Sequence, residues 1–367
     1  MSNKPAGLAL AGLLLFGSLG SAVAGEFALV PFAPASAPDI AGLTAASESA
    51  ALGRGANIGG VLDAPNEGAW GLSLSKQMFT AAASGGFNTI RLPVRFTNHA
   101  AATAPYGLDE AFMQRVDFAI NQALGNGLNI IIDFHHYHQM DGDPLDDGEF
   151  DTDLSDKQSH ERYTAIWKQI AERYRGLPND KVLFELYNEP HGKTQPVWNA
   201  LLARTLEAVR ASNPYRFVLI DPVNWSTPSG LAELQLPAAD RRLIVDVHSY
   251  EPYHFTMQGA DWIEGSAAWR GTSCCDAAQT SAMTGPLDVA AAWSKQNERP
   301  VLLGEFGSNS QAPYADRVTY TAAMREAAEA RGFSWAYWDF ASGEFGPWDA
   351  ETGAWRPELH EALIPPK

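Results

Sequence analysis

Short apolar and β-branched runs recur along the chain between about residues 54 and 340. Several are apolar at nearly every position, as expected for strands buried on both faces of a parallel sheet. The predicted strands are RGANIGG (54–60), TIRLPV (89–94), NIIIDFHH (129–136), VLFELYNE (182–189), RFVLID (216–221), RLIVDVHSY (242–250), PVLLGEFGS (300–308) and SWAYWDF (334–340).

Segments with helical spacing lie between these runs. Examples are residues 109–127, 160–176, 196–212 and 314–332. Eight strands in strict alternation with helices predict a parallel sheet closed into a (β/α)₈ TIM barrel. A doubly wound open sheet is the alternative, and it is disfavoured because no GxGxxG follows the first strand.

The first 50 residues follow a different pattern. Lys4 precedes the apolar stretch LALAGLLLFGSLG, and Ala22-Val23-Ala24 fits a small-residue cleavage site. We therefore expect residues 1–24 to be a signal peptide cleaved near Ala24-Gly25, with an uncleaved membrane anchor as the alternative. Residues 25–50 are rich in Ala, Pro and Ser and predict an arm or linker. A single domain then spans 51–367, and the mature protein should be secreted or periplasmic, without a membrane span and monomeric.

The charge balance limits the partners. A formal net charge of −17 disfavours nucleic acid and anionic membrane surfaces, which require a basic face. A neutral substrate is compatible with this charge. The 11 Trp and 11 Tyr supply flat apolar faces that suit sugar rings, although aromatic side chains also serve core packing.

Polar residues collect where the predicted strands end, which is where barrel active sites lie. Six strands contribute such residues: Arg91, His135, His136, Asn188, Glu189, His248, Tyr250, Glu305 and Trp338. One polar strand end would mean little, but six indicate a shared mouth.

The carboxylates near these ends differ in their expected roles. Glu185 and Glu189 share strand parity, so both should point to the same side of the fourth strand, roughly 13 Å apart. We therefore interpret Glu185 as a structural residue that pairs with Arg91, and expect the partner of Glu189 to be Glu305. Two facing carboxylates suit cleavage of a glycosidic bond, with one protonated and the other ionised. Asn188 could bind a sugar hydroxyl, and Arg91 could keep Glu305 ionised.

The motifs IRLPV, IIDFHHY, LYNEP, DVHSYEP, LLGEFG and WAYWDF together resemble glycoside hydrolase family 5 over residues 54–340. The resemblance implies a (β/α)₈ catalytic domain and retaining hydrolysis of β-glycosidic bonds, with carboxyl groups ~5–5.5 Å apart. It implies Glu189 as acid/base and Glu305 as nucleophile. The implied substrate-binding residues are Arg91, His135, His136, Asn188, His248, Tyr250 and Trp338. Of the two adjacent histidines His135 is favoured, because it shares strand parity with Asp133.

The segment EPYHFTMQGADW (251–262) also resembles bacterial endoglucanases of this family. It makes an endo-β-1,4-glucanase acting on a β-glucan polysaccharide or oligosaccharide the leading expectation. The resemblance leaves β-mannanase, xyloglucanase and β-1,3-glucanase activities open. A non-catalytic carbohydrate-binding barrel is the rival from another class, but it need not keep both carboxylates.

Two further sequence patterns give weaker indications of function. His136-Tyr137-His138 has metal-ligand spacing, but no clear ligand triad accompanies it, so neither a metal nor another cofactor is expected. The acidic segment 141–153 departs from calcium-loop spacing at Leu145 and suits a solvated loop.

The adjacent Cys274 and Cys275 could form a vicinal disulfide or remain free thiols. Four tryptophans in predicted loops are equally compatible with sugar platforms and with packing: Trp70, Trp225, Trp262 and Trp348.

Overall fold

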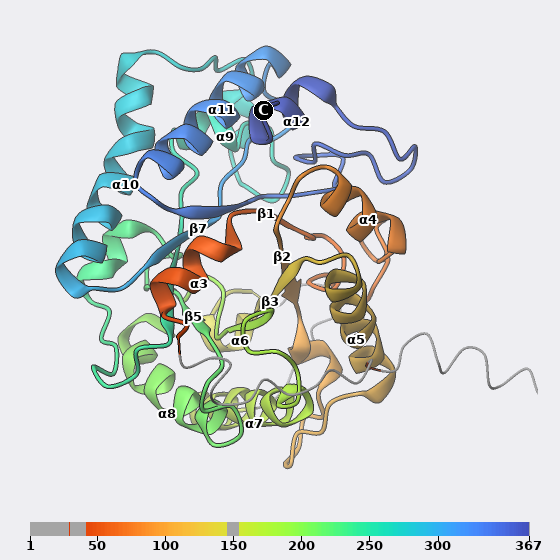
Figure 1. Ribbon diagram of the computed structural model, residues 1–367, viewed down its shortest axis with the longest axis vertical. Helices are drawn as coiled ribbons and strands as arrows, with labels where there is room; N and C mark the ends of the chain where they lie inside the picture. Colours follow the sequence, from red (N-terminus) through yellow and green to blue (C-terminus); the bar gives the residue numbers. More distant parts are fainter. Residues whose placement is uncertain (1–28, 30–41, 145–153, 367) are drawn as a thin grey trace, which may run out of the picture.

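Eight parallel strands form a closed barrel in the order β1 to β8, which confirms the predicted (β/α)₈ architecture. The computed structural model describes residues 29, 42–144 and 154–366, and its helices surround the barrel (Figure 1). The strands are β1 Arg54–Asn57, β2 Thr89–Val94, β3 Asn129–Phe134, β4 Val182–Glu185, β5 Val218–Ile220, β6 Leu243–His248, β7 Val301–Glu305 and β8 Ser334–Tyr337.

The connections between strands are mostly helical. The α-helices are α3 Ala45–Leu52, α4 Lys76–Ser84, α5 Glu110–Gly125, α6 His138–Asp141, α7 Asp156–Tyr174, α8 Trp198–Arg210, α9 Tyr253–Thr256, α10 Ala277–Asn297, α11 Tyr314–Ala330 and α12 Pro357–Leu363. The 3₁₀ helices are Phe96–His99, Gln195–Val197, Pro228–Ala232 and Ser266–Trp269. The predicted strict alternation is wrong at one place, because only the 3₁₀ helix Pro228–Ala232 lies between β5 and β6.

The barrel interior has layers of different polarity. Its lower layer is apolar and contains Ile131, Leu183, Leu219, Ile244 and Leu302. Two residues further along β3 and β4 the paired positions are Asp133 and Glu185. Since alternate residues of a strand face the same side, the interior changes from apolar to charged within one repeat.

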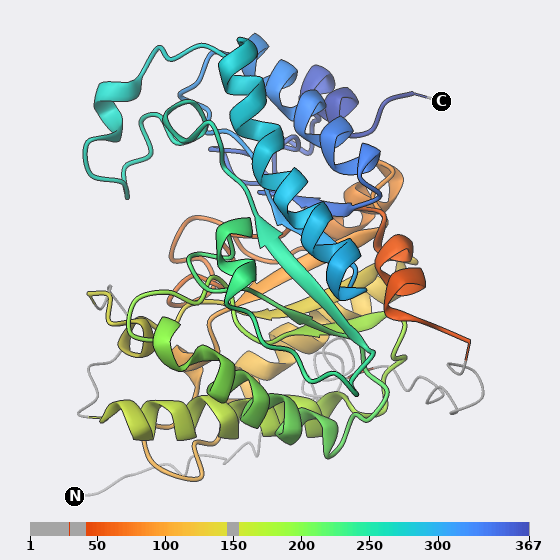
Figure 2. The ribbon, with the colours of Figure 1, turned by 90° about the vertical axis from the view of Figure 1, so that its left-hand side faces the viewer.

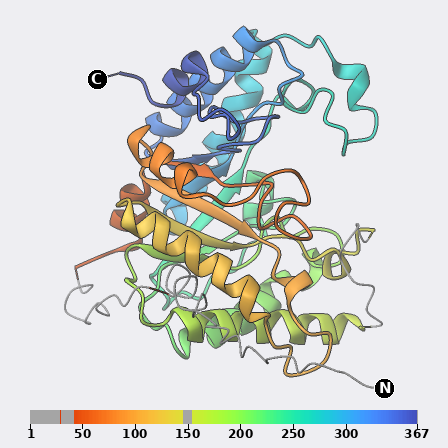
Figure 3. The same ribbon diagram turned by 90° about the vertical axis from the view of Figure 1, so that its right-hand side faces the viewer.

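Helix α3 covers the end of the barrel opposite the carboxyl ends of the strands. Leu52 packs with the lower apolar layer. Figures 2 and 3 show α3 on the opposite side of the molecule from the long loop after β6. The predicted division at residue 51 therefore needs correction, because 45–50 belong to a helix packed on the barrel. The helix escaped prediction because its alanines and serines lack a strong apolar stripe.

Most strands end before their predicted limits. β4 ends at Glu185, and Glu189 has φ 52°, so the expected continuation of the strand to Glu189 is wrong. Similarly, β3 ends at Phe134 and His136 has φ 64°. A register shift between Val247 and His248 pairs His248 with Glu305. The mouth is thus built largely by residues just beyond the strands.

The expected signal peptide lies outside the described residues, as does most of the predicted arm. No helix among the described residues is long and apolar enough to cross a membrane.

Candidate active site

The guanidinium of Arg91 is the centre of a buried charged network. Its Nε and Nη2 donate to the two carboxylate oxygens of Glu185 at 2.8 and 2.5 Å. Nη1 donates to Glu305 Oε1 at 2.7 Å, and Nη2 also donates to Asn188 Oδ1 at 2.8 Å. The predicted pairing of Glu185 with Arg91 is confirmed.

More acids surround this arginine than its single charge can balance. Asp133 Oδ2 lies 3.1 Å from Nη2, and Asp246 Oδ2 lies 3.8 Å from Nε. Burial is the main cause that raises the pKa of Asp133 and Asp246 well above ordinary values. Burial alone would lower the pKa of Arg91, but the facing carboxylates raise it well above its usual value. Arg91 is therefore a permanent cation, while burial favours the protonated forms of Asp133 and Asp246.

Glu305 occupies a position suited to a nucleophile. It ends β7 and is 5% exposed, with Arg91 on Oε1 and the Tyr250 hydroxyl donating to Oε2 at 2.7 Å. Burial raises the pKa of Glu305, while His248, Arg91 and Tyr250 act in the opposite direction. The two donors favour the ionised form that a nucleophile requires.

Glu189 faces Glu305 across the mouth. An oxygen of each carboxylate and a ring nitrogen of His248 all lie within 4.8 Å of one another. His248 Nδ1 lies 2.8 Å from Glu189 Oε1. Burial raises the pKa of Glu189 to about 7 and lowers that of His248 to about 4. Near neutral pH, Glu189 can therefore hold or release a proton beside an uncharged imidazole.

The other predicted residues border this pair. His135 Nδ1 lies 2.7 Å from Asp133 Oδ2, which fixes the ring beside the network of Arg91. The Trp338 ring stacks on His135 with centroids 5.7 Å apart. A Cβ on Gly59 would lie 2.8 Å from this indole, so only glycine leaves room for it there. The His136 ring packs edge-on against the His135 ring, with centroids 4.1 Å apart. All nine predicted site residues therefore meet at one end of the barrel, and their individual roles stay predictions.

Several members of the site were not predicted. Asn57 accepts from Arg91 Nη1 at 2.9 Å, and Asp221 accepts from Ser226 Oγ at 2.6 Å. Asp221 and Asp246 were detectable as acids within or at the end of apolar strands. His191, two residues after Glu189, carried no periodic signal.

Some side chains also have the spacing of metal ligands. Among the described residues, three groups bring ligand atoms within 4.8 Å: Asp63 with His135 and His136; Glu185 with Asp221, Asp246 and His248; and Glu189 with His248 and Glu305. His138 joins none of these groups, although its ring stacks on that of His136 with centroids 5.3 Å apart. The last group is the facing carboxylate pair itself.

Three of the four loop tryptophans are exposed. Trp70, Trp225 and Trp262 are 44%, 51% and 55% exposed, whereas Trp348 is buried and stacks on Phe340. Trp348 is therefore a packing residue, and the other three remain available to a ligand.

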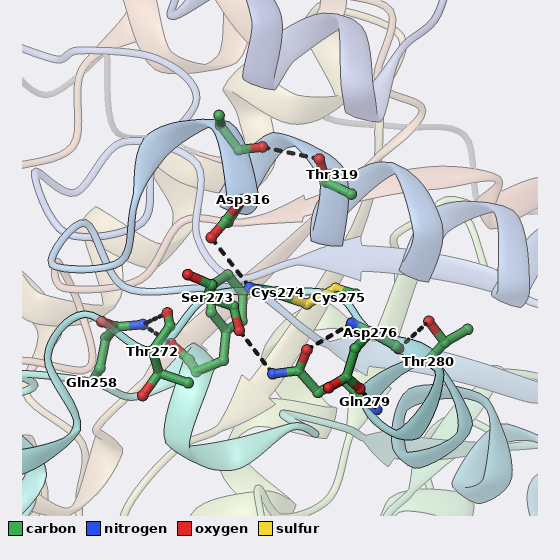
Figure 4. The surroundings of a disulfide bond; sticks show 12 residues. Gln258, Thr272, Ser273, Cys274, Cys275, Asp276, Gln279, Thr280, Asp316 and Thr319 are labelled. Atoms are coloured by element: carbon green, nitrogen blue, oxygen red, sulfur yellow. Dashed lines mark hydrogen bonds between the residues drawn. A yellow bond between two sulfur atoms is a disulfide. The ribbon is translucent and has the colours of Figure 1, made fainter.

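The structure joins Cys274 and Cys275 in a vicinal disulfide in the loop before α10 (Figure 4). The Cys274 amide donates to Asp316 of α11 at 3.2 Å. The acidic segment lies mainly outside the described residues, which resume at Leu154.

Residues 53–344 match the family model described as Cellulase (glycosyl hydrolase family 5). The chain belongs to this family. It is 32% identical over 323 residues to Endoglucanase H of Acetivibrio thermocellus, covering 86% of this chain and 33% of that protein. Cellulase/esterase CelE of the same organism is 30% identical, covering 84% of this chain and 39% of that protein. The chain thus spans between a third and two fifths of the length of these two relatives.

Solved structures extend the similarity to the fold. Thermotoga maritima Cel5A in complex with mannotriose superposes with a TM-score of 0.81 at 37% identity, covering 87% of this chain and 99% of that one. The same enzyme in complex with cellobiose gives a TM-score of 0.81 at 38% identity, with the same coverage of both chains.

Proposed function

We propose that the protein is a retaining endo-β-1,4-glucanase. The observation that carries the proposal is that Glu189 and Glu305 face each other, with one oxygen of each carboxylate within 4.8 Å of the other, as a closely spaced pair requires. Retaining glycosidases place their carboxyl groups ~5–5.5 Å apart, whereas inverting enzymes leave ~6.5–9.5 Å for a water molecule. Family membership and the names of the relatives support the reaction and the β-glucan substrate.

In the first step, Glu305 attacks the anomeric carbon and the glycosidic bond breaks. Glu189 gives its proton to the leaving oxygen, and a glycosyl ester of Glu305 forms. In the tautomer with its proton on Nδ1, His248 donates to Oε1 of Glu189, which leaves Oε2 to deliver the proton. In the second step Glu189 takes a proton from water, and the resulting hydroxide displaces Glu305 from the sugar.

The surrounding groups would hold the sugar. Asn188 Oδ1 accepts a hydrogen bond from Arg91, so the amide hydrogens of Asn188 are left to donate to a hydroxyl beside the reacting carbon. Trp338 offers an aromatic face to a sugar ring. The mechanism uses protein groups alone and requires no cofactor.

The function is tested by reducing-sugar release from carboxymethyl-cellulose, barley β-glucan, xyloglucan, glucomannan and laminarin. Release from the first two, lost in Glu305→Gln and kept in the exposed control Glu298→Gln, is expected. NMR of the first product should show the β-anomer. An initial α-anomer would refute retention, and release mainly from glucomannan or laminarin would replace the substrate. Binding of these sugars without release would favour the non-catalytic barrel.

We also propose that the protein is exported as a monomer. The support is the Lys4 flank, the apolar stretch behind it and the Ala22-Val23-Ala24 site. N-terminal sequencing of the mature protein, with light scattering for its mass, tests both claims. An intact Met1 in exported protein would refute cleavage.

A further inference from the structure

His191 makes two hydrogen bonds that together determine its charge. Its Nδ1 lies 2.6 Å from the backbone oxygen of Glu189, and its Nε2 lies 2.8 Å from Oδ2 of Asp143. A carbonyl and an ionised carboxylate can only accept hydrogen bonds, so both ring nitrogens must carry a proton. This geometry requires an imidazolium.

The neighbouring groups are consistent with a cation. Asp141, Asp143 and His136 act on the ring from the segment after β3, and His138 lies 3.9 Å from the same Asp143 oxygen. Glu189 and Lys193 lie on the loop of His191 itself. Burial alone would lower the pKa of His191, but Asp141, the Glu189 carbonyl and Asp143 raise it above its ordinary value. The ring stacks on Trp225 with centroids 4.8 Å apart, a favourable position for a cation over an indole.

The backbone around His191 is held close to the neighbouring loop. Gly192 has φ 52°, and a Cβ there would lie only 2.2 Å from the carbonyl oxygen of Asp141. The Lys193 amide donates to that same oxygen at 2.7 Å. Glu189 is itself in the left-handed region, which is unfavourable for a residue with a side chain. The segment therefore needs a fixed contact to keep Glu189 in this conformation.

We propose that His191 is a positioning residue for Glu189, an imidazolium that ties the Glu189 backbone and the exposed Trp225 ring to Asp143 on the adjacent loop. The proposal rests on the assignment of Glu189 as the acid/base residue and adds a partner outside the facing carboxylate pair. The positive charge of His191 also lowers the pKa of Glu189, against the effect of burial. It therefore helps Glu189 to act as a base in the second step.

Two variants remove the positive charge in different ways. His191→Asn keeps a donor near the Glu189 carbonyl but removes the charge. Asp143→Asn leaves the ring intact but removes the carboxylate that keeps it protonated. In both variants the pKa of Glu189 should rise, so the basic limb of kcat/KM on β-glucan should move to higher pH. We expect kcat/KM to fall roughly tenfold in His191→Asn, as for loss of a charge-assisted hydrogen bond.

The charge is measured directly by ¹⁵N NMR of histidine-labelled protein, with His160→Asn on α7 as the matched control. At pH 6, His191 should show two protonated ring nitrogens in the wild type, and Asp143→Asn should lose this signature at lower pH than the wild type. A single protonated nitrogen in the wild type, or variants with the wild-type pH profile, would overturn the proposal. The NMR signature needs no substrate. It therefore tests the charge of His191 even if the protein hydrolyses none of the glucans.

Discussion

Glu48 on α3 offers a test of how burial without a full set of partners affects stability. The residue is 2% exposed, and its Oε1 has no hydrogen-bond partner among the described residues. Burial and then Asp180 raise its pKa to about 7, against the opposing effects of Lys181 and Arg242. The perturbation is Glu48→Gln, which keeps the shape of the side chain and removes its charge.

The sign follows from the two protonation equilibria. The unfolded chain loses the Glu48 proton near pH 4.5, whereas the folded protein keeps it until about pH 7. The folded state is thus favoured by this group at low pH, and that advantage is lost as the pH rises between these values. At ~1.4 kcal/mol per pH unit, the difference between these two pKa values corresponds to about 3 kcal/mol of folding stability lost by pH 8.

The variant should therefore be more stable than the wild type at pH 8 by about 1–2 kcal/mol. The value is below 3 kcal/mol because the new amide hydrogens need partners of their own, at a cost of ~1 kcal/mol or more. At pH 4.5 the variant should be equal or less stable. Urea unfolding at both pH values measures the difference, with the exposed Glu298→Gln as control. A stability difference that is the same at pH 4.5 and pH 8 would refute the reasoning.

Further predictions concern the mouth of the barrel and the disulfide. Tyr250→Phe removes a hydrogen-bond donor to Glu305, so kcat should fall roughly 10- to 100-fold. The pKa of Glu305 should rise, which moves the acid limb of the pH–activity profile to higher pH, and an unchanged acid limb would contradict the contact. Prolonged dialysis against EDTA should leave activity intact, and a loss restored by a divalent cation would instead indicate a metal between Glu189 and Glu305. Reduction of Cys274–Cys275 should change the free energy of unfolding by less than ~1 kcal/mol, because a bond between neighbours closes almost no loop. Thermal melts with and without reductant, alongside thiol counting, check this, and a large loss would point to a packing role for the bridge.

The barrel was predictable because its strands are apolar almost throughout. The run TIRLPV in β2, for example, is buried at every position. The polar ends of these runs also indicated the mouth, since parallel strands bring their carboxyl ends together. This is why Glu189 and Glu305 could be paired from residues more than a hundred positions apart in the chain.

The remaining features depend on contacts through space. The left-handed conformation of Glu189 ends the alternation that the parity argument assumed. The pairing of His248 with Glu305 arises from a register shift between β6 and β7 that no local sequence pattern predicts. His191 acquires its charge from Asp143, which lies on another loop. Helix α3 has an alanine- and serine-rich sequence whose packing against the barrel is a tertiary effect.

The network around Arg91 has a consequence for the order of folding events. This one side chain contacts Asn57, Glu185 and Glu305, which are 34, 94 and 214 positions away along the chain. Contacts of such long range form late, after the loop-closure entropy between distant strands has been overcome. A half-barrel could acquire helices and an apolar layer while its nucleophile still lacked this cation. Recovery of hydrolysis during refolding should therefore lag behind recovery of helical signal, and the onset of turnover would time the closure of the ring of strands.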